Sequence, residues 1–120
     1  MFQEDWIMRQ IENLVNFLTT VVLNKKSTSY EVSKDNIISE TDILYKQLTD
    51  LINSKKIDEA ENLLFDKIAK NNKRYLELAV DFYARLNGLD DNTLENSGFT
   101  RKEIEDGLMD VADIFGVSII

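Results

Sequence analysis

Two helix-forming segments joined by a very short connection constrain the fold of this chain more than any other feature. Apolar residues in segments 41–54 and 58–70 recur at the spacing that places them along one face of a helix. Ser54, Lys55 and Lys56 leave too little chain to carry the second helix away from the first, so we expect an antiparallel helical hairpin. The apolar positions are Leu44, Leu48, Leu51, Ile52, Ala60, Leu63, Leu64 and Ile68.

Residue choices at helix ends predict where the other helices of the chain begin and end. The chain contains no proline and only four glycines, which leaves long stretches free to be helical. We expect three helix starts in which a polar N-cap is followed three residues later by an acid, and two helix ends at glycine. The starts are Ser39 with Asp42, Asp58 with Glu61, and Thr100 with Glu103, and the ends are a left-handed C-cap at Gly88 and a stop at Gly116.

Two further helical segments follow the hairpin, with a short helical turn predicted at 92–95 between them. The three aromatic rings of the first segment are expected in the core, the alternative being a lining that receives a peptide. Its apolar face comprises Tyr75, Ala79, Phe82, Tyr83 and Leu86, and that of the second comprises Ile104, Leu108, Val111, Ala112 and Phe115.

The residues around the predicted hairpin resemble the middle of a tetratricopeptide repeat over about residues 41 to 74, where Lys55-Lys56-Ile57-Asp58-Glu59-Ala60 follows the spaced leucines. The pattern differs at the turn, where Lys55 and Lys56 replace the usual Gly-Asp, and at Gln47, which takes an apolar position. Three segments, at 1–11, 59–65 and 101–108, are also similar to a family of small uncharacterised bacterial proteins described as tetratricopeptide-like. They read MFQEDWIMRQI, EAENLLF and RKEIEDGL.

This resemblance implies an all-α fold of about five helices, arranged as antiparallel pairs in a right-handed superhelix. It brings no known activity to transfer. With 120 residues, the chain has the length of one globular unit. We expect an N-terminal amphipathic helix in residues 1–23, a polar linker in 24–36, and a tetratricopeptide-like helical domain in 37–120.

Composition excludes several classes of chemistry. The chain lacks cysteine and histidine, so disulfides, Ser-His-Asp or Cys-His catalysis and ordinary zinc sites are not expected. A net charge of −8 opposes nucleic-acid binding, which would need a concentrated basic face. The nearest candidate, at Lys67, Lys70, Lys73 and Arg74, is interpreted as a solvated face near a helix end.

The first helix carries an apolar stripe of about 200°, whereas a helix resting on one core needs little more than ~100°. The centre of the stripe is formed by Ile7, Ile11, Leu14, Val15, Leu18, Val21 and Val22. We therefore expect a part of this helix, together with the apolar tail at the other end of the chain, to contact a partner. The candidate contact residues are Phe2, Trp6, Met8, Phe17, Val21, Ile119 and Ile120. The linker reads as a mobile connection, with Tyr30 and Val32 as its anchor points.

The leading hypothesis is a non-enzymatic helical module for protein–protein interaction, with a protein partner or a second copy of the chain, and with no catalytic residues, cofactor or metal. One alternative is a protein that lies on a membrane surface through its first helix, but that helix carries few basic residues. Another is a carboxylate- or metal-dependent enzyme. It would use an acidic stripe that we interpret as hydrated, at Glu103, Asp106, Asp110 and Asp113. The acidic start is unlike a secretory signal, so a cytoplasmic location is expected.

Overall fold

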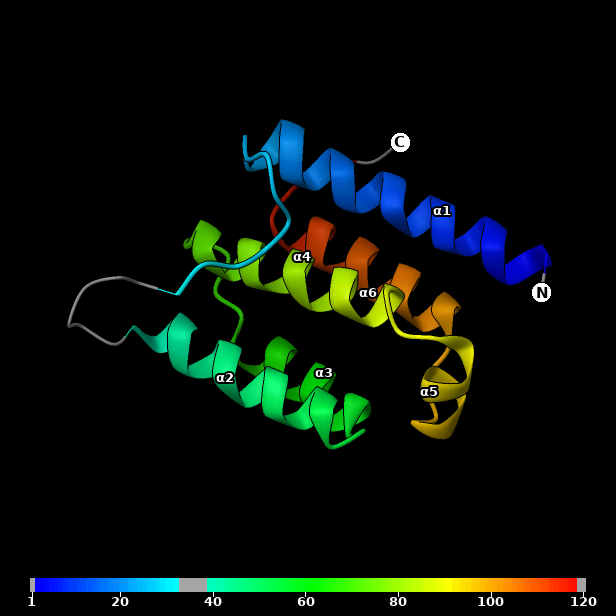
Figure 1. The fold of residues 1–120 in the computed structure, drawn as a ribbon. Coiled ribbons are helices and arrows are strands. Elements are labelled where there is room, and N and C mark those ends of the chain that lie inside the picture. Colours follow the sequence, from blue (N-terminus) through cyan, green and yellow to red (C-terminus); the bar gives the residue numbers. More distant parts are fainter. Residues whose placement is uncertain (1, 33–38, 119–120) are drawn as a thin grey trace.

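The structure, a computed structural model, describes residues 2–32 and 39–118, with side-chain environments from residue 5 onward. The described residues form helices and no strand, which confirms the all-α prediction (Figure 1). Five of the α-helices are long, as expected, and one is short. The elements are α1 (Phe2–Phe17), the π-helical turn η1 (Leu18–Val22), α2 (Glu40–Asn53), α3 (Ile57–Lys67), α4 (Lys73–Asn87), α5 (Asp91–Asn96) and α6 (Arg101–Ile114).

Helix α4 is the centre of the fold. It contacts α1, α2 and α6, and ten of its residues are buried. In Figure 1, α1 lies on one side of the α4–α6 pair and the α2–α3 pair lies on the other. The predicted face of α4 is buried as expected, and Phe82 and Tyr83 are among the largest enclosed side chains. The aromatic rings of this helix therefore belong to the core.

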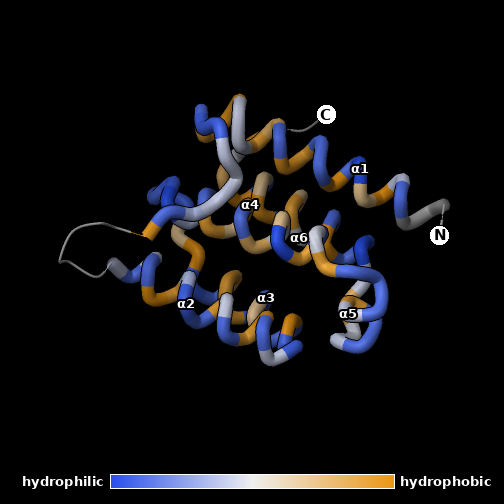
Figure 2. Tube along the Cα trace, in the orientation of Figure 1, coloured by the Kyte–Doolittle hydropathy of each residue, from blue (hydrophilic) through white to orange (hydrophobic). Residues whose placement is uncertain are grey.

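The predicted hairpin is present, with α2 and α3 packed side by side (Figure 1). Hydrophobic residues recur along each long helix rather than in one block, as an amphipathic helix requires (Figure 2). The right-handed superhelix implied by the resemblance stays a prediction. Helix α4 packs mainly against α1, α2 and α6, so the helices do not form a simple series of successive pairs.

Two of the three predicted helix starts are correct. Ser39 accepts a hydrogen bond from the Asp42 amide, and Thr100 forms a complete capping box with Glu103. The predicted cap at Asp58 is wrong, because α3 begins at Ile57 and Asp58 lies inside its first turn. A carboxylate there still interacts favourably with the positive end of the helix dipole.

The helix ends divide into two kinds. The predicted left-handed conformation at Gly88 is wrong, since its φ is −81°. Helices α2, α5 and α6 instead end in Schellman motifs, in which the amide two residues past the C-cap bonds a carbonyl of the last turn. Gly98 and Gly116 occupy the left-handed position in α5 and α6, with φ of 69° and 72°. In α2 that position is held by Lys55, with φ of 62°.

Replacing Lys55 with glycine is therefore expected to raise the free energy of unfolding by up to about 1 kcal/mol, because a side chain in the left-handed region costs roughly 1–2 kcal/mol and the freer unfolded chain offsets part of the gain. Urea unfolding of the variant and the wild-type protein measures the difference. Lys46, an exposed lysine inside α2, is the control, and Lys46→Gly should lower the free energy of unfolding by up to about 1 kcal/mol. Equal effects of the two substitutions would contradict this account of the turn.

The segment between η1 and α2 is anchored to the core by Tyr30, as predicted. Its hydroxyl donates to Asp42 Oδ1 (2.6 Å) and accepts from Arg74 Nη2 (2.7 Å), and its backbone amide donates to Asp81 Oδ1 (3.2 Å). Val32, the other expected anchor, is exposed, and residues 33–36 of the predicted linker lie outside the described residues. The contact also corrects the interpretation of Arg74, which lies over the Tyr30 ring and pairs with Asp42 rather than belonging to a solvated basic face.

Candidate functional site

Helix α1 has an enclosed inner face and an exposed outer face. Ile11 and Val15 of α1 and Leu18 at the start of η1 are buried where this segment packs on α4 and α6, so this face is part of the core. The outer face exposes 59% of Trp6, 37% of Phe17 and, in η1, 65% of Val21. The chain buries one side of the wide apolar stripe and leaves these three side chains in contact with solvent.

The turn η1 changes which residues of the stripe are enclosed. Its amide-to-carbonyl bonds span five residues, as in Leu23 N–H to Leu18 O (2.9 Å), so the 100° step of an α-helix no longer applies. As a result Thr19 is buried and Val21, predicted at the centre of the stripe, is exposed. The sequence pattern assumed a regular helix through residue 23 and therefore placed Val21 at the centre of the stripe, whereas its exposure agrees with its place among the candidate contact residues.

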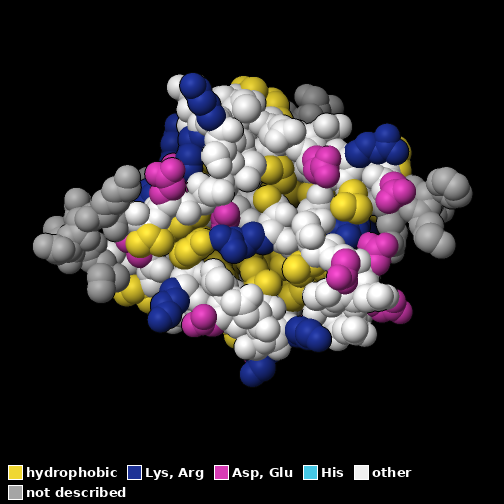
Figure 3. Space-filling view, in the orientation of Figure 1, with side chains coloured by type: hydrophobic (Ala, Val, Ile, Leu, Met, Phe, Trp, Pro, Cys, Tyr) yellow, Lys and Arg dark blue, Asp and Glu magenta, His cyan; other side chains and the backbone are white. Residues whose placement is uncertain are grey.

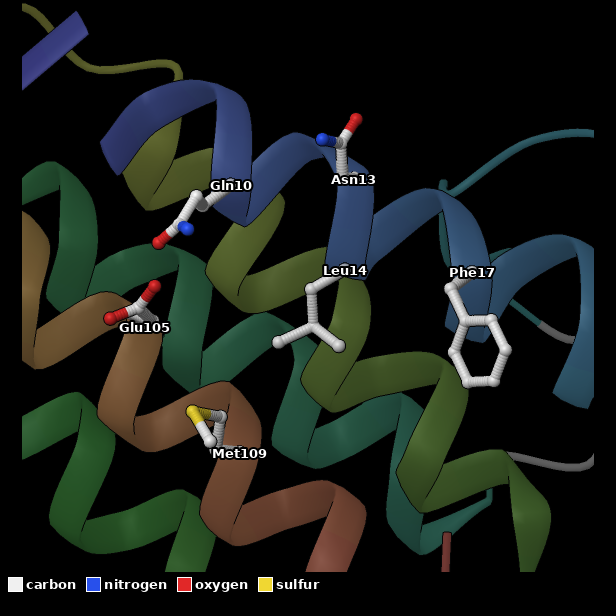
Figure 4. Close-up of a pocket in the computed structure, with 6 residues that line it drawn as sticks. All are labelled: Gln10, Asn13, Leu14, Phe17, Glu105 and Met109. Carbon is white, nitrogen blue, oxygen red and sulfur yellow. The ribbon is translucent and has the colours of Figure 1, made fainter. Parts of the chain in front are cut away.

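A groove of about 390 Å³ runs between α1 and α6, beside the exposed face of α1. Leu14 of α1 and Met109 of α6 extend toward each other across it, and Gln10 extends toward Glu105 (Figure 4). Met109 is 46% exposed, so the α6 side of the groove is accessible to solvent. The lining residues are Gln10, Asn13, Leu14, Phe17, Glu105 and Met109.

The exposed face of α1 and the groove form one continuous surface. Trp6, Gln10, Asn13 and Phe17 follow one another at helical spacings of four, three and four residues, so they lie along one line of α1. Met109 faces the same space from α6. We call the surface formed by Trp6, Leu14, Phe17 and Met109 the α1–α6 face.

The α6 edge of the groove is acidic. Glu105 Oε1 and Asp106 Oδ1 each lie 3.1 Å from Lys102 Nζ, so these three side chains form one surface cluster. Asp113, one turn beyond Met109, is also exposed. Helix α6 carries five carboxylates against two basic residues, and one of the two, Arg101, is buried. A positively charged group approaching the groove therefore meets a negative edge.

The structure brings together some of the predicted contact residues and separates others. Trp6, Phe17 and Val21 lie on the exposed side of the first helix, whereas Met8 lies in a different depression, between α1 and α4. The side chain of Phe2, and Ile119 and Ile120, lie outside the described residues. Met109 was not among the predicted contact residues. An apolar residue between Asp106 and Asp113 on an otherwise acidic helical face was the available signal.

The acidic stripe of α6 is exposed along its length. Glu103, Asp106, Asp110 and Asp113 are all accessible to solvent. Within the described part of the chain, no group of three or more Asp or Glu residues is arranged to hold a metal ion. A cation site needs ligands that converge from several elements, and these side chains project from one helix.

One carboxylate near this stripe is half-buried. Glu61 of α3 accepts a hydrogen bond from the Tyr83 hydroxyl (2.6 Å). Burial raises the pKa of the Glu61 carboxyl above its ordinary value, and the negative charge of Glu103 acts in the same direction, although the Tyr83 hydrogen bond opposes them. Burial and the neighbouring Glu61 raise the pKa of the Tyr83 phenol far above its usual range. The hydrogen bond joins α3 to α4 at the edge of the core, where the Tyr83 ring also packs against Gly107 of α6, so we assign the pair a structural role.

The raised pKa of Glu61 predicts a pH-dependent loss of stability. A carboxyl whose pKa is higher in the folded state contributes stability that is complete below its unfolded value, near 4.5, and is lost as the pH rises through the folded value. Glu61→Gln stays neutral and should therefore gain stability relative to the wild-type protein between about pH 4 and pH 7. Urea unfolding of both proteins at several pH values gives this difference, with Glu59→Gln on the exposed side of α3 as the control. If the difference in unfolding free energy between the two proteins does not change with pH, the Glu61 carboxyl has the same pKa in the folded and unfolded states, and the prediction is wrong.

Basic side chains do not gather on the visible face of the molecule. Figure 3 shows lysine and arginine dispersed among aspartate and glutamate around a band of hydrophobic atoms. This face lacks the concentrated positive patch that phosphate backbones require. In the described residues, no helix has the length and apolar composition needed to cross a membrane.

A family model described as "Family of unknown function (DUF6483)" matches residues 1–116. The match confirms the resemblance to an uncharacterised family, and it does not test the tetratricopeptide-like fold. No curated protein and no solved structure matches the chain.

Proposed function

The chain belongs to the family of unknown function DUF6483, and we propose that it is a non-enzymatic helical module that binds another protein chain through the α1–α6 face. The observation that carries the proposal is the exposure of Trp6 and Phe17 on a helix whose opposite face is core. Tryptophan and other large apolar residues supply much of the energy of protein interfaces. Single exposed apolar side chains are common on protein surfaces. Here, however, the exposed side chains lie next to an accessible groove, and together they form a larger apolar surface.

The enzyme alternative has less support. Its carboxylates project into solvent from one helix, and the groove lacks a titratable pair held in a position to exchange protons. Association with an anionic membrane surface is disfavoured by the carboxylates Glu105, Asp106 and Asp113 at the edge of the groove, which such a surface would repel.

Site-specific photo-crosslinking in living cells tests the proposal. A photoreactive phenylalanine analogue replaces Phe17 in one variant and Met109 in another, and both should give the same discrete protein adduct. Ile43 is the matched control because it is also an exposed apolar residue, but it lies on α2, away from the groove. Point replacement is preferable to deletion of the first helix, since deletion would expose the core residues Ile11, Val15 and Leu18.

An adduct shared by positions 17 and 109 and missing at 43 would support the module, whether the captured chain is another protein or a second copy. Absence of a discrete adduct at 17 and 109, or an identical pattern at 43, would overturn it. Adducts with lipids alone would contradict the proposal and support association with a membrane surface instead.

A further inference from the structure

We propose that the partner is a basic amphipathic helix, seated in the groove between α1 and α6. This inference rests on the proposed function and names the chemical class of partner for the same surface. Two neighbouring helices leave a groove along their length, and a third helix inserts its apolar side chains there. In this groove Leu14, Phe17 and Met109 provide the apolar contacts.

The charge around the groove indicates which charged residues the polar face of the partner should carry. Helix α1 carries three carboxylates and one arginine, and α6 carries five carboxylates and two basic residues. Arg101 is buried and bonded to Asp91, and Lys102 offsets one of the two charges of Glu105 and Asp106. With Asp113 also exposed, the α6 edge of the groove keeps a net negative charge. Lysine or arginine flanking the apolar stripe of the partner would complement this edge.

The same charges argue against a second copy of the chain as the occupant. A symmetric contact through the α1–α6 face would bring two acidic α6 edges close together, in a protein that already carries a net charge of −8. A small organic ligand also fits poorly. The groove has few polar groups that converge on one point, because Asn13 points away from Gln10 and Glu105 (Figure 4).

The fluorescence of the single tryptophan can report binding at this surface. Trp6 is the only tryptophan, and it lies on the α1–α6 face, one turn before Gln10. The probe is a helical peptide of about 18 residues without tryptophan, long enough for about five turns, with leucine on one face and lysine on the other. Its controls are a peptide with glutamate in place of every lysine and a lysine peptide of the same composition with its amphipathic order scrambled.

Only the ordered lysine peptide should give a saturable blue shift of the Trp6 emission. Raising the ionic strength from about 0.05 M to about 0.5 M should weaken its binding several-fold, because the attraction between exposed charges is screened. The double variant Glu105→Gln, Asp113→Asn should weaken binding at least ~5-fold. The matched control, Glu59→Gln with Asp66→Asn, removes the same charge from the exposed side of α3 and should leave the affinity unchanged.

Equal binding of the lysine and glutamate peptides, or equal weakening by the two double variants, would overturn the assignment of a basic helix. So would an intermolecular crosslink from position 17 or 109 that captures only a second copy of the chain. In each of these cases the photo-crosslinks still decide the proposed function separately, because a shared adduct at 17 and 109 supports the module whatever its partner's charge.

Discussion

Arg101→Ala is expected to lower the free energy of unfolding by roughly 3–5 kcal/mol, a large part of the ~5–15 kcal/mol that stabilises a typical domain. The guanidinium is buried and donates to Asn87 O (2.8 Å), Asn87 Oδ1 (3.0 Å), Leu89 O (2.8 Å) and Asp91 Oδ1 (3.0 Å). Alanine would leave the Asn87 acceptors unpaired in the core. Asp91 is largely exposed, so most of the loss comes from the backbone and amide acceptors.

The neighbouring Lys102 provides the control. Its ammonium forms only surface ion pairs, with Glu105 and Asp106, and Lys102→Ala should change stability by less than about 1 kcal/mol. Arg101→Lys keeps the charge but lacks the planar fork that reaches several acceptors at once, so its loss should fall between the two. Urea unfolding followed by circular dichroism measures all three. If Arg101→Ala were no worse than Lys102→Ala, the assigned role of Arg101 would be wrong.

Gly107→Ala is expected to destabilise the fold by about 3 kcal/mol, near the upper end of the cost of inserting a methyl group into a packed core. A Cβ at this position would lie 2.7 Å from Tyr83 Cε1 and closer still to the Cζ and hydroxyl oxygen of the same ring. Tyr83 is fully enclosed and its hydroxyl is bonded to Glu61, so the ring has little freedom to move. The clash should exceed the ~1 kcal/mol that alanine gains over glycine within a helix.

Two further variants isolate the cause. Gly88→Ala is the matched control, because Gly88 has a right-handed backbone and its Cβ would meet only carbonyl oxygens at 3.5 and 3.6 Å, so stability should be unchanged or slightly higher. In a Tyr83→Leu background, which removes the ring, Gly107→Ala should cost much less, and a double-mutant cycle by thermal unfolding gives this coupling. Additive effects of the two substitutions would show that the ring and the glycine do not share this space.

The apolar periodicity of the chain was sufficient to predict its hairpin and the buried face of α4, because both depend on local spacing along regular helices. The capping residues Ser39 and Thr100 were found for a similar reason, since their hydrogen bonds join residues only three positions apart. The prediction at Gly88 failed because glycine permits a left-handed end without requiring one. Lys55 adopts that conformation without being glycine, so composition alone gave no indication of it.

The candidate surface was only partly predictable. The width of the apolar stripe indicated that α1 would keep an exposed side, but the position of Met109 beside it depends on how α6 packs against α1, which no local pattern encodes. The turn η1 also required the tertiary structure, because its change of helical step moves Val21 out of the buried stripe.

The residues that carried the family resemblance have identifiable structural roles in this chain. In the segment RKEIEDGL, Arg101 bonds the end of α4, Glu103 completes the capping box, and Gly107 leaves room for Tyr83. In EAENLLF, Ala60 and Leu64 are buried and Glu61 bonds Tyr83. These two segments contribute to the packing of the fold, and the proposed contact surface takes Glu105 from the first of them and Trp6 from the third segment, MFQEDWIMRQI.

The proposed contact surface requires that the rest of the chain leaves the outer face of α1 uncovered while the inner face is core. Acrylamide quenching of Trp6 fluorescence in the purified protein, with its mass measured by light scattering under the same conditions, tests this directly. Because Trp6 is 59% exposed, we predict strong quenching, well above that of a buried tryptophan and below that of a free tryptophan amide, in a protein that is a single copy. Strong protection of Trp6 in a single copy would contradict the account, because the chain itself would then cover the surface assigned to a partner.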